Sequence, residues 1–321
     1  MKSPTNPNLL RYRPWRGTYL GPWNGMRAIA RVCLSLIFRR KLFWALYGLS
    51  MLIFLFYFFG QYLQVFLEQK LGEENLRLGG VFTRNLKPET LMKRLRNAMQ
   101  LNGSSDTYGN FLWFEGYIVV IILAFAGSVL IGNDFHYGSL PFYLSKPISR
   151  WHYVLGKCLA IGVLINMMTT APCLLLFIEY GFIDNRENFD YFFDESRLLL
   201  GILGYGAVLT VTLSLVLMAT ATWLRKTIPM VMIWITIFIL GRMLQRWLVD
   251  GLGMNPGWRL MDLWNNMYLT GMWIMGKDHA ELLPSTQLQP AYENAALAVA
   301  VICIVCVLYL HRRIRAVEIV S

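Results

Sequence analysis

The sequence has few of the side chains that build catalytic, metal or disulfide centres. Its five cysteines all lie in or beside apolar segments, and the long polar stretches contain none, which argues against a disulfide framework. The four histidines are scattered among polar stretches and chain ends, and no apolar run contains paired carboxylates or a Ser/His arrangement. We therefore predict that this chain has no catalytic residue, no cofactor-binding residue and no metal ligand.

Two short motifs have the spacing of ligand sites but lack an essential part. Residues 271–277 spell G-x-x-x-x-G-K, as in a phosphate-binding loop, yet Asp278 stands where that loop needs Ser or Thr to hold magnesium. Cys303 and Cys306 form a C-x-x-C pair, but they lie within an apolar run rather than in the soluble context of a metal or redox site. We interpret the two cysteines as small polarisable residues of a helix.

Long apolar runs, by contrast, are abundant. Hydrophobic residues make up 56% of the 321 residues, and a transmembrane helix needs about 20 consecutive, mostly apolar residues. Six runs are close to this length or exceed it: 42–64, 112–131, 154–178, 198–222, 228–248 and 292–310. They predict an all-α integral membrane protein with six transmembrane helices, in which a six-span domain at 42–321 follows a basic region at 1–41.

The positive charge is concentrated before the first run. The chain carries a net charge of +11, and its first 41 residues contain nine Lys or Arg and no acidic residue. Such flanks stay cytoplasmic and are attracted to anionic lipid, and the chain has no motif for nucleic-acid recognition. We therefore predict a cytoplasmic amino terminus, contact with membrane lipids and no nucleic-acid partner. An even number of spans places the carboxyl terminus on the cytoplasmic side too.

Part of this basic region has a helical pattern. In residues 23–38, Met26, Ile29 and Cys33 recur at steps of three and four, while Arg27 falls on the other face. This pattern is typical of an amphipathic helix that lies along the membrane interface. We interpret the proline-rich stretch before it as a disordered basic tail.

The connecting segments carry further expectations. We predict a helix at 88–101, within the polar segment that follows the first run and that we place outside. The acidic segment 179–197 also fits the outer side, whereas the basic turn at 223–229 fits the cytoplasm. Residues 249–291 are rich in Trp, and polar residues such as Arg259 interrupt their apolar stretches. We therefore expect a re-entrant or interfacial segment on the outer side before the last span.

Polar residues within the apolar runs give little sign of an ion pathway. Ion-coupled carriers place ionisable groups at mid-membrane, whereas we expect Glu115, Arg242 and Glu293 to lie toward the span ends. In the third run, Asn166 predicts a hydrogen bond to a neighbouring helix and Pro172 predicts a kink.

The fourth run contains small residues that favour close helix packing. Gly201, Gly204 and Gly206 precede several Thr and Ser residues. Small residues let membrane helices approach one another closely. We expect this packing either within the chain or against a second copy.

The segment between the second and third runs carries a resemblance. Residues 132–157 read GNDFHYGSLPFYLSKPISRWHYVLGK and are too polar and too broken by Gly and Pro to cross a bilayer. Their acidic residue, Gly-Ser-Leu, Leu-Ser-Lys-Pro-Ile-Ser-Arg and Tyr-x-x-Gly-Lys resemble the first cytoplasmic loop of ABC-2 type permeases, the membrane subunits of type-2 ABC exporters. Asp134 and Ser139 replace the Glu and Thr that are usual there, and they keep the charge and the hydroxyl.

The resemblance implies a function and a set of partners. It implies that this loop is a cytoplasmic coupling helix that docks on a separate ATPase subunit, which holds ATP and magnesium. It also implies that this chain is not itself an enzyme, and that two permease subunits, identical or different, form an exporter in a bacterial inner membrane. The residues that it implies for coupling are Asp134, Gly138, Ser139, Leu140, Leu144, Ser145, Pro147, Arg150 and Lys157.

Other interpretations of the same residues stay open at this point. The loop could be an ordinary interfacial helix, with aromatic side chains among lipid headgroups and basic groups on lipid phosphate. The protein could be a membrane-embedded lipid-modifying enzyme. It could also be an ion-coupled carrier without an ATPase partner.

Overall fold

The computed structural model describes residues 21–72, 101, 103–132, 134, 149–183, 192–193, 195–224, 226–279 and 289–314, and every regular element within them is a helix. In chain order the helices are α1 (Pro22–Phe38), α2 (Lys41–Gly72), α4 (Ser105–Gly127), η1 (Ser128–Gly132), α7 (Arg150–Met168), α8 (Thr170–Ile183), α10 (Ser196–Leu224), α11 (Thr227–Ile235), η2 (Thr236–Leu240), α12 (Gly241–Arg246), η3 (Trp247–Gly251), η4 (Pro256–Met261), α13 (Leu263–Ile274) and α14 (Tyr292–Arg313). The expected basic tail before residue 21 and, apart from Leu101, the helix expected at 88–101 lie outside the described residues.

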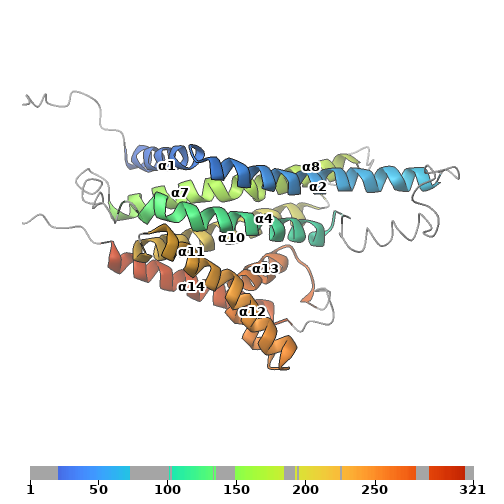
Figure 1. Cartoon of the computed structure of the whole chain (residues 1–321). Coiled ribbons are helices and arrows are strands. Elements are labelled where there is room, and N and C mark those ends of the chain that lie inside the picture. Colours follow the sequence, from blue (N-terminus) through green and yellow to red (C-terminus); the bar gives the residue numbers. More distant parts are fainter. Residues whose placement is uncertain are drawn as a thin grey trace, which may run out of the picture.

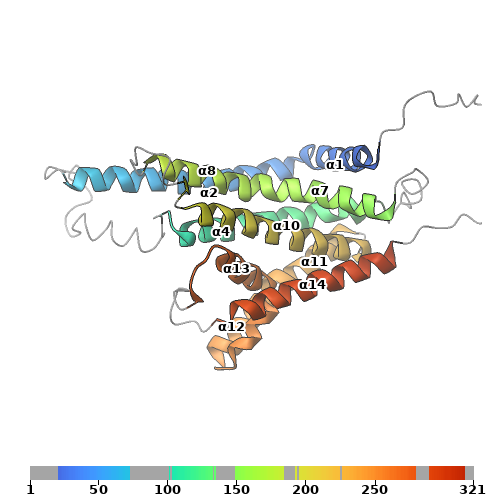
Figure 2. The same ribbon diagram turned by 180° about the vertical axis from the view of Figure 1, so that it is seen from behind.

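Six helical segments are long and apolar enough to cross a membrane, which confirms the predicted all-α membrane fold. They are Lys41–Gly60, Ser105–Gly132, Arg150–Phe182, Ser196–Leu224, Thr227–Gly251 and Tyr292–Arg313. Figures 1 and 2 show that successive spans run in alternating directions. One end of the bundle, here called the α1 end, therefore gathers α1, the starts of α2, α7 and α11, and the ends of η1, α10 and α14. The opposite end is called the far end.

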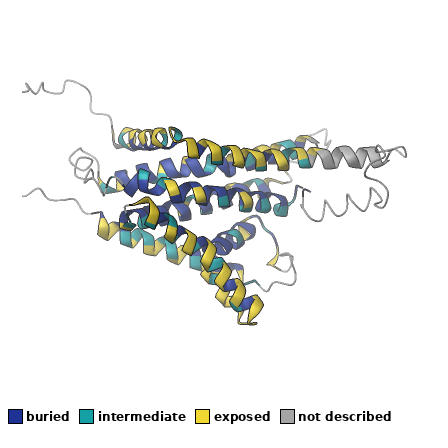
Figure 3. Ribbon diagram, in the orientation of Figure 1, coloured by how far each residue is buried: buried dark blue, intermediate teal, exposed yellow. Residues whose placement is uncertain are grey.

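The spans differ in how far the chain itself covers them. In the most apolar stretch of Ser105–Gly132, 72% of the residues are buried, against 22% in Lys41–Gly60 and 17% in both Thr227–Gly251 and Tyr292–Arg313. Figure 3 shows the same contrast between the mostly buried α4 and the largely exposed α2 and α12. The core lies along α4, α7, α10 and α13, and the outer helices present wide apolar surfaces.

The amphipathic helix predicted at 23–38 is confirmed as α1. Pro22 lies in its first turn. Backbone N–H groups in the first turn have no acceptor within the helix, so the lack of an N–H group in proline costs no hydrogen bond there. Its predicted apolar face, including Ile29, Cys33 and Ile37, is buried. This face packs against α7, so α1 is attached to the third span rather than to the first span that directly follows it.

The third span contains the predicted kink and the predicted polar contact. The helix is interrupted at Thr169, three residues before Pro172. This interruption separates α7 from α8. The side-chain amide of Asn166 donates to the hydroxyl of Thr210 on α10 at 2.8 Å. This hydrogen bond joins the third span to the fourth.

The segment before the last span is inserted into the bundle. Asp262 caps α13, and its Oδ1 accepts hydrogen bonds from the backbone N–H groups of Trp264 at 3.0 Å and Asn265 at 3.2 Å. The 12 residues of α13 are too short to span a bilayer, yet most of them are buried among α10, α14 and α4. The expectation for residues 249–291 is either a re-entrant or an interfacial segment. The buried helix α13 agrees with the re-entrant form and not with a helix that lies on the surface.

The small residues of the fourth span serve packing within the chain. A Cβ atom at Gly201 would lie 2.7 Å from the Cα atom of Met275, and one at Gly206 would lie 2.1 Å from the hydroxyl of Thr170. At Gly204 the nearest atom belongs to Ile274. The first of the two expected partners, another part of the same chain, therefore occupies this face.

The expectation that the ionisable residues lie toward the span ends is wrong for Glu115. The second span begins at Ser105, seven residues before the predicted start, so Glu115 lies ten residues inside it and is fully buried. Its Oε2 accepts a 2.6 Å hydrogen bond from the hydroxyl of Ser50 on α2. Arg242 lies in the second half of the fifth span, nine residues before its end, and Glu293 is the second residue of the last span.

Gly271 gives a direct test of how tightly α13 is packed. A Cβ atom there would lie 2.3 Å from the ring of Tyr205, a fully buried side chain on α10. We expect Gly271→Ala to destabilise the protein by about 1–3 kcal/mol, because neither helix has room to move apart. The measurement is thermal unfolding of the purified protein in detergent.

The matched control is Gly48→Ala in α2, where a Cβ atom would meet no atom within 4 Å. This change should be neutral or slightly stabilising, since alanine favours a helix more than glycine does. An unfolding temperature for Gly271→Ala equal to that of Gly48→Ala would contradict the described packing of α13.

Candidate functional site

The loop that carries the resemblance is only partly described. Six of the nine residues expected to couple the loop to a partner lie outside the described residues: Gly138, Ser139, Leu140, Leu144, Ser145 and Pro147. The other three, Asp134, Arg150 and Lys157, lie at the base of the loop, where the second span ends and the third begins. This base is the candidate site.

An ion pair closes the base of the loop. The Nζ atom of Lys157 lies 2.7 Å from Oδ2 of Asp134 and also donates to the carbonyl oxygen of Leu130. The hydroxyl of Tyr153 donates to the same Oδ2 atom at 2.8 Å. We call Asp134, Tyr153 and Lys157 the clamp. It connects Asp134, which follows η1, to the first two turns of α7, and so ties the end of the second span to the start of the third.

The clamp is buried, which makes its pairing obligatory. Lys157 is 3% exposed and Tyr153 is fully buried, and the ammonium group also lies 5.5 Å from the centre of the Tyr153 ring. A buried charge is strongly unfavourable unless an opposite charge and hydrogen bonds satisfy it. Asp134 supplies the charge, and Leu130 and Tyr153 supply hydrogen-bonding groups.

The start of α7 is fixed by a local cap. Ser149 and His152 form a capping box, in which the backbone N–H group of His152 donates to Oγ of Ser149 and the backbone N–H group of Ser149 donates to Nδ1 of His152. Arg150 lies between them and is half-buried. Among the residues that the structure describes, Arg150 has no ion-pair partner, so it is not part of the clamp.

Helix α1 lies directly against the clamp. At Gly156 a Cβ atom would lie 3.1 Å from the backbone carbonyl oxygen of Met26, so glycine permits the two helices to touch. The thiol of Cys33 lies beside Lys157. Burial raises the pKa of this thiol, and the neighbouring ammonium only partly opposes that shift. Cys33 is therefore a neutral packing residue.

Two further contacts connect the loop base to other spans. The hydroxyls of Ser128 in η1 and Thr227 at the start of α11 are 2.7 Å apart. The ring of Trp151 stacks on that of His311 near the end of α14, with centroids 5.8 Å apart. The base of the loop is thus in contact with α1 and with the fifth and sixth spans.

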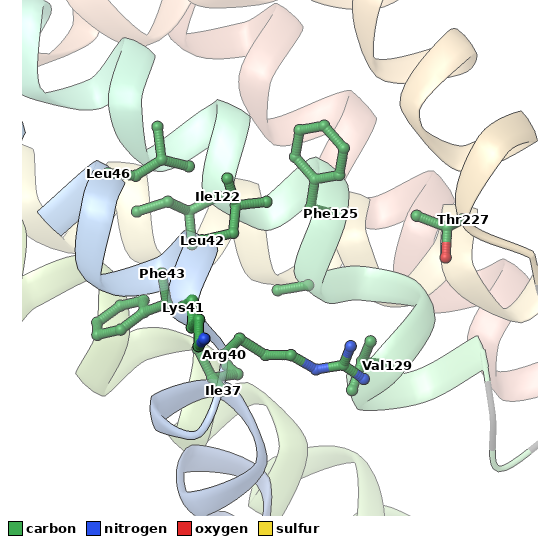
Figure 4. Close-up of a pocket in the computed structure, with 11 residues that line it drawn as sticks. Ile37, Arg40, Lys41, Leu42, Phe43, Leu46, Ile122, Phe125, Val129 and Thr227 are labelled. Carbon is green, nitrogen blue, oxygen red and sulfur yellow. The ribbon is translucent and has the colours of Figure 1, made fainter.

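A recess of about 370 Å³ lies beside this base, at the corner between α1 and α2. Figure 4 shows the side chain of Arg40 extending from that corner toward Val129 on η1, with Ile122 and Phe125 on α4. Among the described residues, those that line the recess include no carboxylate, histidine or cysteine.

The motifs that resembled ligand sites have structural roles. Lys277 of the G-x-x-x-x-G-K motif forms an ion pair with Asp106 in the first turn of α4, and Gly276 has a positive φ of 79° that ends α13. The thiol of Cys303 lies 3.7 Å from the hydroxyl of Thr212 on α10. Within the described part of the chain, no group of three or more His, Cys, Asp or Glu residues could hold a metal ion.

Sequence reasoning found the ends of the clamp but missed its middle. The resemblance named Asp134 and Lys157 as coupling residues, whereas Tyr153 and Ser149 belong to the matching motifs but were given no role. The spacing of Tyr153 and Lys157, four residues apart at the start of a helix, places both on one face and is a signal that would have found the pair.

Comparison with known proteins identifies a family. The model of the family described as ABC-2 family transporter protein matches residues 28–310. No curated protein matches this chain. The matched region begins within α1 and ends within α14, so it includes the clamp, the first five spans and most of the sixth.

A double-mutant cycle tests the clamp. We expect Lys157→Met to destabilise the protein by about 3 kcal/mol, because it leaves Asp134 in a largely buried position without its cation. The double variant Asp134→Asn/Lys157→Met should lose less than the sum of the two single variants, by about 1–3 kcal/mol. Unfolding in detergent measures all three.

Arg150→Gln is the control for this cycle, because it removes a cation of the same loop base that has no described ion-pair partner. Its effect should stay within about 0.5 kcal/mol. Strictly additive effects of the two clamp substitutions would show that Asp134 and Lys157 do not interact.

Proposed function

Because this chain belongs to the ABC-2 family of transporter proteins, we propose that it is the membrane-spanning permease subunit of an ATP-driven exporter. A separate ATPase subunit binds ATP and magnesium and hydrolyses ATP, and two permease subunits together form the transport path. The observation that carries this proposal is the clamp, which holds both ends of the proposed coupling loop at a point in contact with several spans.

The clamp gives a physical route for coupling. A loop with free ends would absorb a push from a partner by bending, whereas a loop whose ends are tied by a buried ion pair passes the displacement into η1 and α7. From there the contact between Ser128 and Thr227 leads to the fifth span, and the stacking of Trp151 on His311 leads to the sixth. Movement of the loop base would therefore tilt the second and third spans together.

The distribution of basic residues supports an orientation with the α1 end in the cytoplasm. Basic side chains near span ends favour the cytoplasmic side. Described basic residues at the α1 end include Arg27, Arg31, Arg39, Arg40, Lys41, Arg150, Lys157, Lys226, Arg312 and Arg313. We propose that both termini are cytoplasmic and that the membrane is a bacterial inner membrane. Reaction of a single cysteine at Ser104 with an impermeant thiol reagent in intact cells checks this orientation.

The exposed aromatic face of α2 supports the proposal of a second permease subunit. Trp44, Phe56 and Phe59 are 56%, 50% and 60% exposed, and large exposed apolar surfaces of a membrane protein face either lipid or another subunit. The glycine face of α10 is already occupied within the chain, which leaves α2 as the proposed seam. A transport-active lone monomer in a native mass measurement would contradict this assembly.

The proposed docking face of the loop is tested by substitution. Leu140 and Leu144 are four residues apart, and we propose that they insert into a groove of the ATPase subunit. We expect Leu140→Ala/Leu144→Ala to leave the permease folded and inserted but to remove most transport-stimulated ATP hydrolysis, since the lost apolar burial amounts to a few kcal/mol. Copurification of the ATPase subunit and ATP hydrolysis in liposomes are measured.

The matched control is Leu155→Ala/Leu159→Ala, which removes two leucines at the same spacing from the exposed face of α7, where they are 54% and 47% exposed. This control should bind the ATPase subunit and support coupled hydrolysis at the wild-type level. If Leu140→Ala/Leu144→Ala also does so, the loop is an ordinary interfacial helix and its coupling role is refuted.

A further inference from the structure

A second polar site lies at the far end of the bundle, away from the loop base. A pocket of about 200 Å³ is enclosed by α4, α12, η4, α13 and the chain just before α14. Its lining includes three arginines: Arg242 and Arg246, which lie one turn apart on α12, and Arg259 on η4. Charged side chains beside lipid-facing spans are unfavourable unless acidic side chains or a bound ligand neutralise them.

One of the three arginines is paired, and two are not. Arg259 is 2% exposed, and its guanidinium lies 2.6 Å from Oδ1 of Asp250. Arg242 instead lies over the rings of Trp113, at 4.8 Å, and Tyr117, at 5.4 Å. In the described part of the chain, no carboxylate forms an ion pair with Arg242 or Arg246, so both cations are available to a ligand.

The carboxylate closest to these cations is already engaged. Asp262 is buried, and its Oδ1 caps α13 through the N–H groups of Trp264 and Asn265. Burial raises the pKa of Asp262, while those N–H groups and the charges of Arg242 and Arg246 oppose the shift. With Arg259 neutralised by Asp250, the described lining of the pocket keeps two cations against one carboxylate, so it favours an anion.

Buried polar atoms without partners show what else the ligand must offer. Nε of Arg259 is a buried donor that has no acceptor in the described structure, and an anionic oxygen of the ligand would accept its hydrogen bond. Oε1 of Gln245 and Oδ2 of Asp262 are buried acceptors without a donor, on side chains that are 3% and 1% exposed. Unsatisfied buried groups of this kind are costly and normally find a partner. The ligand therefore supplies hydroxyl donors next to its anionic group.

The surroundings of the pocket are apolar. Phe114 on α4 forms part of its wall and is 52% exposed. Met243 and Trp247 lie on the fifth span, which also carries Arg242 and Arg246, and each is 62% exposed. In a bilayer these side chains face acyl chains rather than water. A ligand that enters this pocket from the bilayer is therefore amphiphilic.

We propose that this pocket binds the headgroup of an anionic amphiphile, a phosphate ester with neighbouring hydroxyl groups such as a phosphoglycerol. Arg242 and Arg246 hold the phosphate oxygens, Nε of Arg259 donates to a third oxygen, and Gln245 and Asp262 accept from the hydroxyls. The acyl chains lie along the exposed face of the fifth span. The inference does not depend on an ATPase partner, because binding is a property of this chain alone.

Thermal unfolding of the full chain in an uncharged detergent tests the proposal. Four additions are compared: phosphatidylglycerol, phosphatidylcholine, phosphatidic acid and free glycerol phosphate. Phosphatidylglycerol at about a hundred times its Kd should raise the unfolding temperature by roughly 5 °C. Phosphatidic acid, which has the phosphate but no hydroxyls, should bind more weakly, and the other two should bind least.

Substitutions locate the effect. Arg242→Gln/Arg246→Gln should weaken the apparent affinity for phosphatidylglycerol by at least tenfold, since each arginine contributes a charged hydrogen bond. The control Arg312→Gln/Arg313→Gln removes the same charge from exposed positions at the α1 end and should keep the wild-type response. If the double variant fails to fold, Arg246→Gln alone replaces it, because the Arg246 side chain is exposed and the expected loss is still about tenfold.

Three results would overturn the proposal. An unchanged response of Arg246→Gln would place the lipid elsewhere. Equal stabilisation by phosphatidylcholine would remove the selectivity for an anion. Equal stabilisation by free glycerol phosphate would identify a soluble phosphate ester, not an amphiphile, as the ligand.

Discussion

A charge placed inside an apolar bundle has to be paired, and this requirement explains how distant parts of the chain are joined. Lys157 pairs with Asp134, Lys277 with Asp106, and Arg259 with Asp250. Each lysine or arginine is at least nine-tenths buried, so each pair costs much more to break than a pair on a soluble surface. The first pair closes the loop between the second and third spans. The second attaches the inserted helix α13 to the start of α4, and the third fixes the turn after the fifth span.

The two ends of the bundle use this requirement in different ways. At the α1 end, the cation of the clamp pairs with Asp134 and donates to the carbonyl oxygen of Leu130, while Tyr153 donates to Asp134. This set of buried contacts suits the proposed transmission of movement. At the far end, Arg242 and Arg246 face a pocket that holds unsatisfied acceptors, which suits an element that exchanges a ligand.

Most of the fold could be predicted from apolar run length alone, because the requirement for about 20 apolar residues is local. The six spans were predicted in this way, whereas α1 was predicted from the spacing of its apolar residues and the kink from Pro172. The start of the second span was not, because Asp106 makes its first turn look like a loop. Its charge is neutralised by Lys277, which is 171 residues away. For the same reason Glu115 was misplaced toward a span end. The far-end pocket depends on how the fifth span, η4 and α13 meet, and no local pattern contains that information.

The central claim is that the loop between the second and third spans contacts an ATPase subunit. Site-specific photo-crosslinking in cells measures this contact directly, with the photoreactive residue at Leu144 and, as a control at the far end, at Phe193, which is 76% exposed. The account predicts that position 144 cross-links to a protein that mass spectrometry identifies as an ATP-binding subunit, and that position 193 does not. Cross-links from position 144 to lipid alone would contradict it.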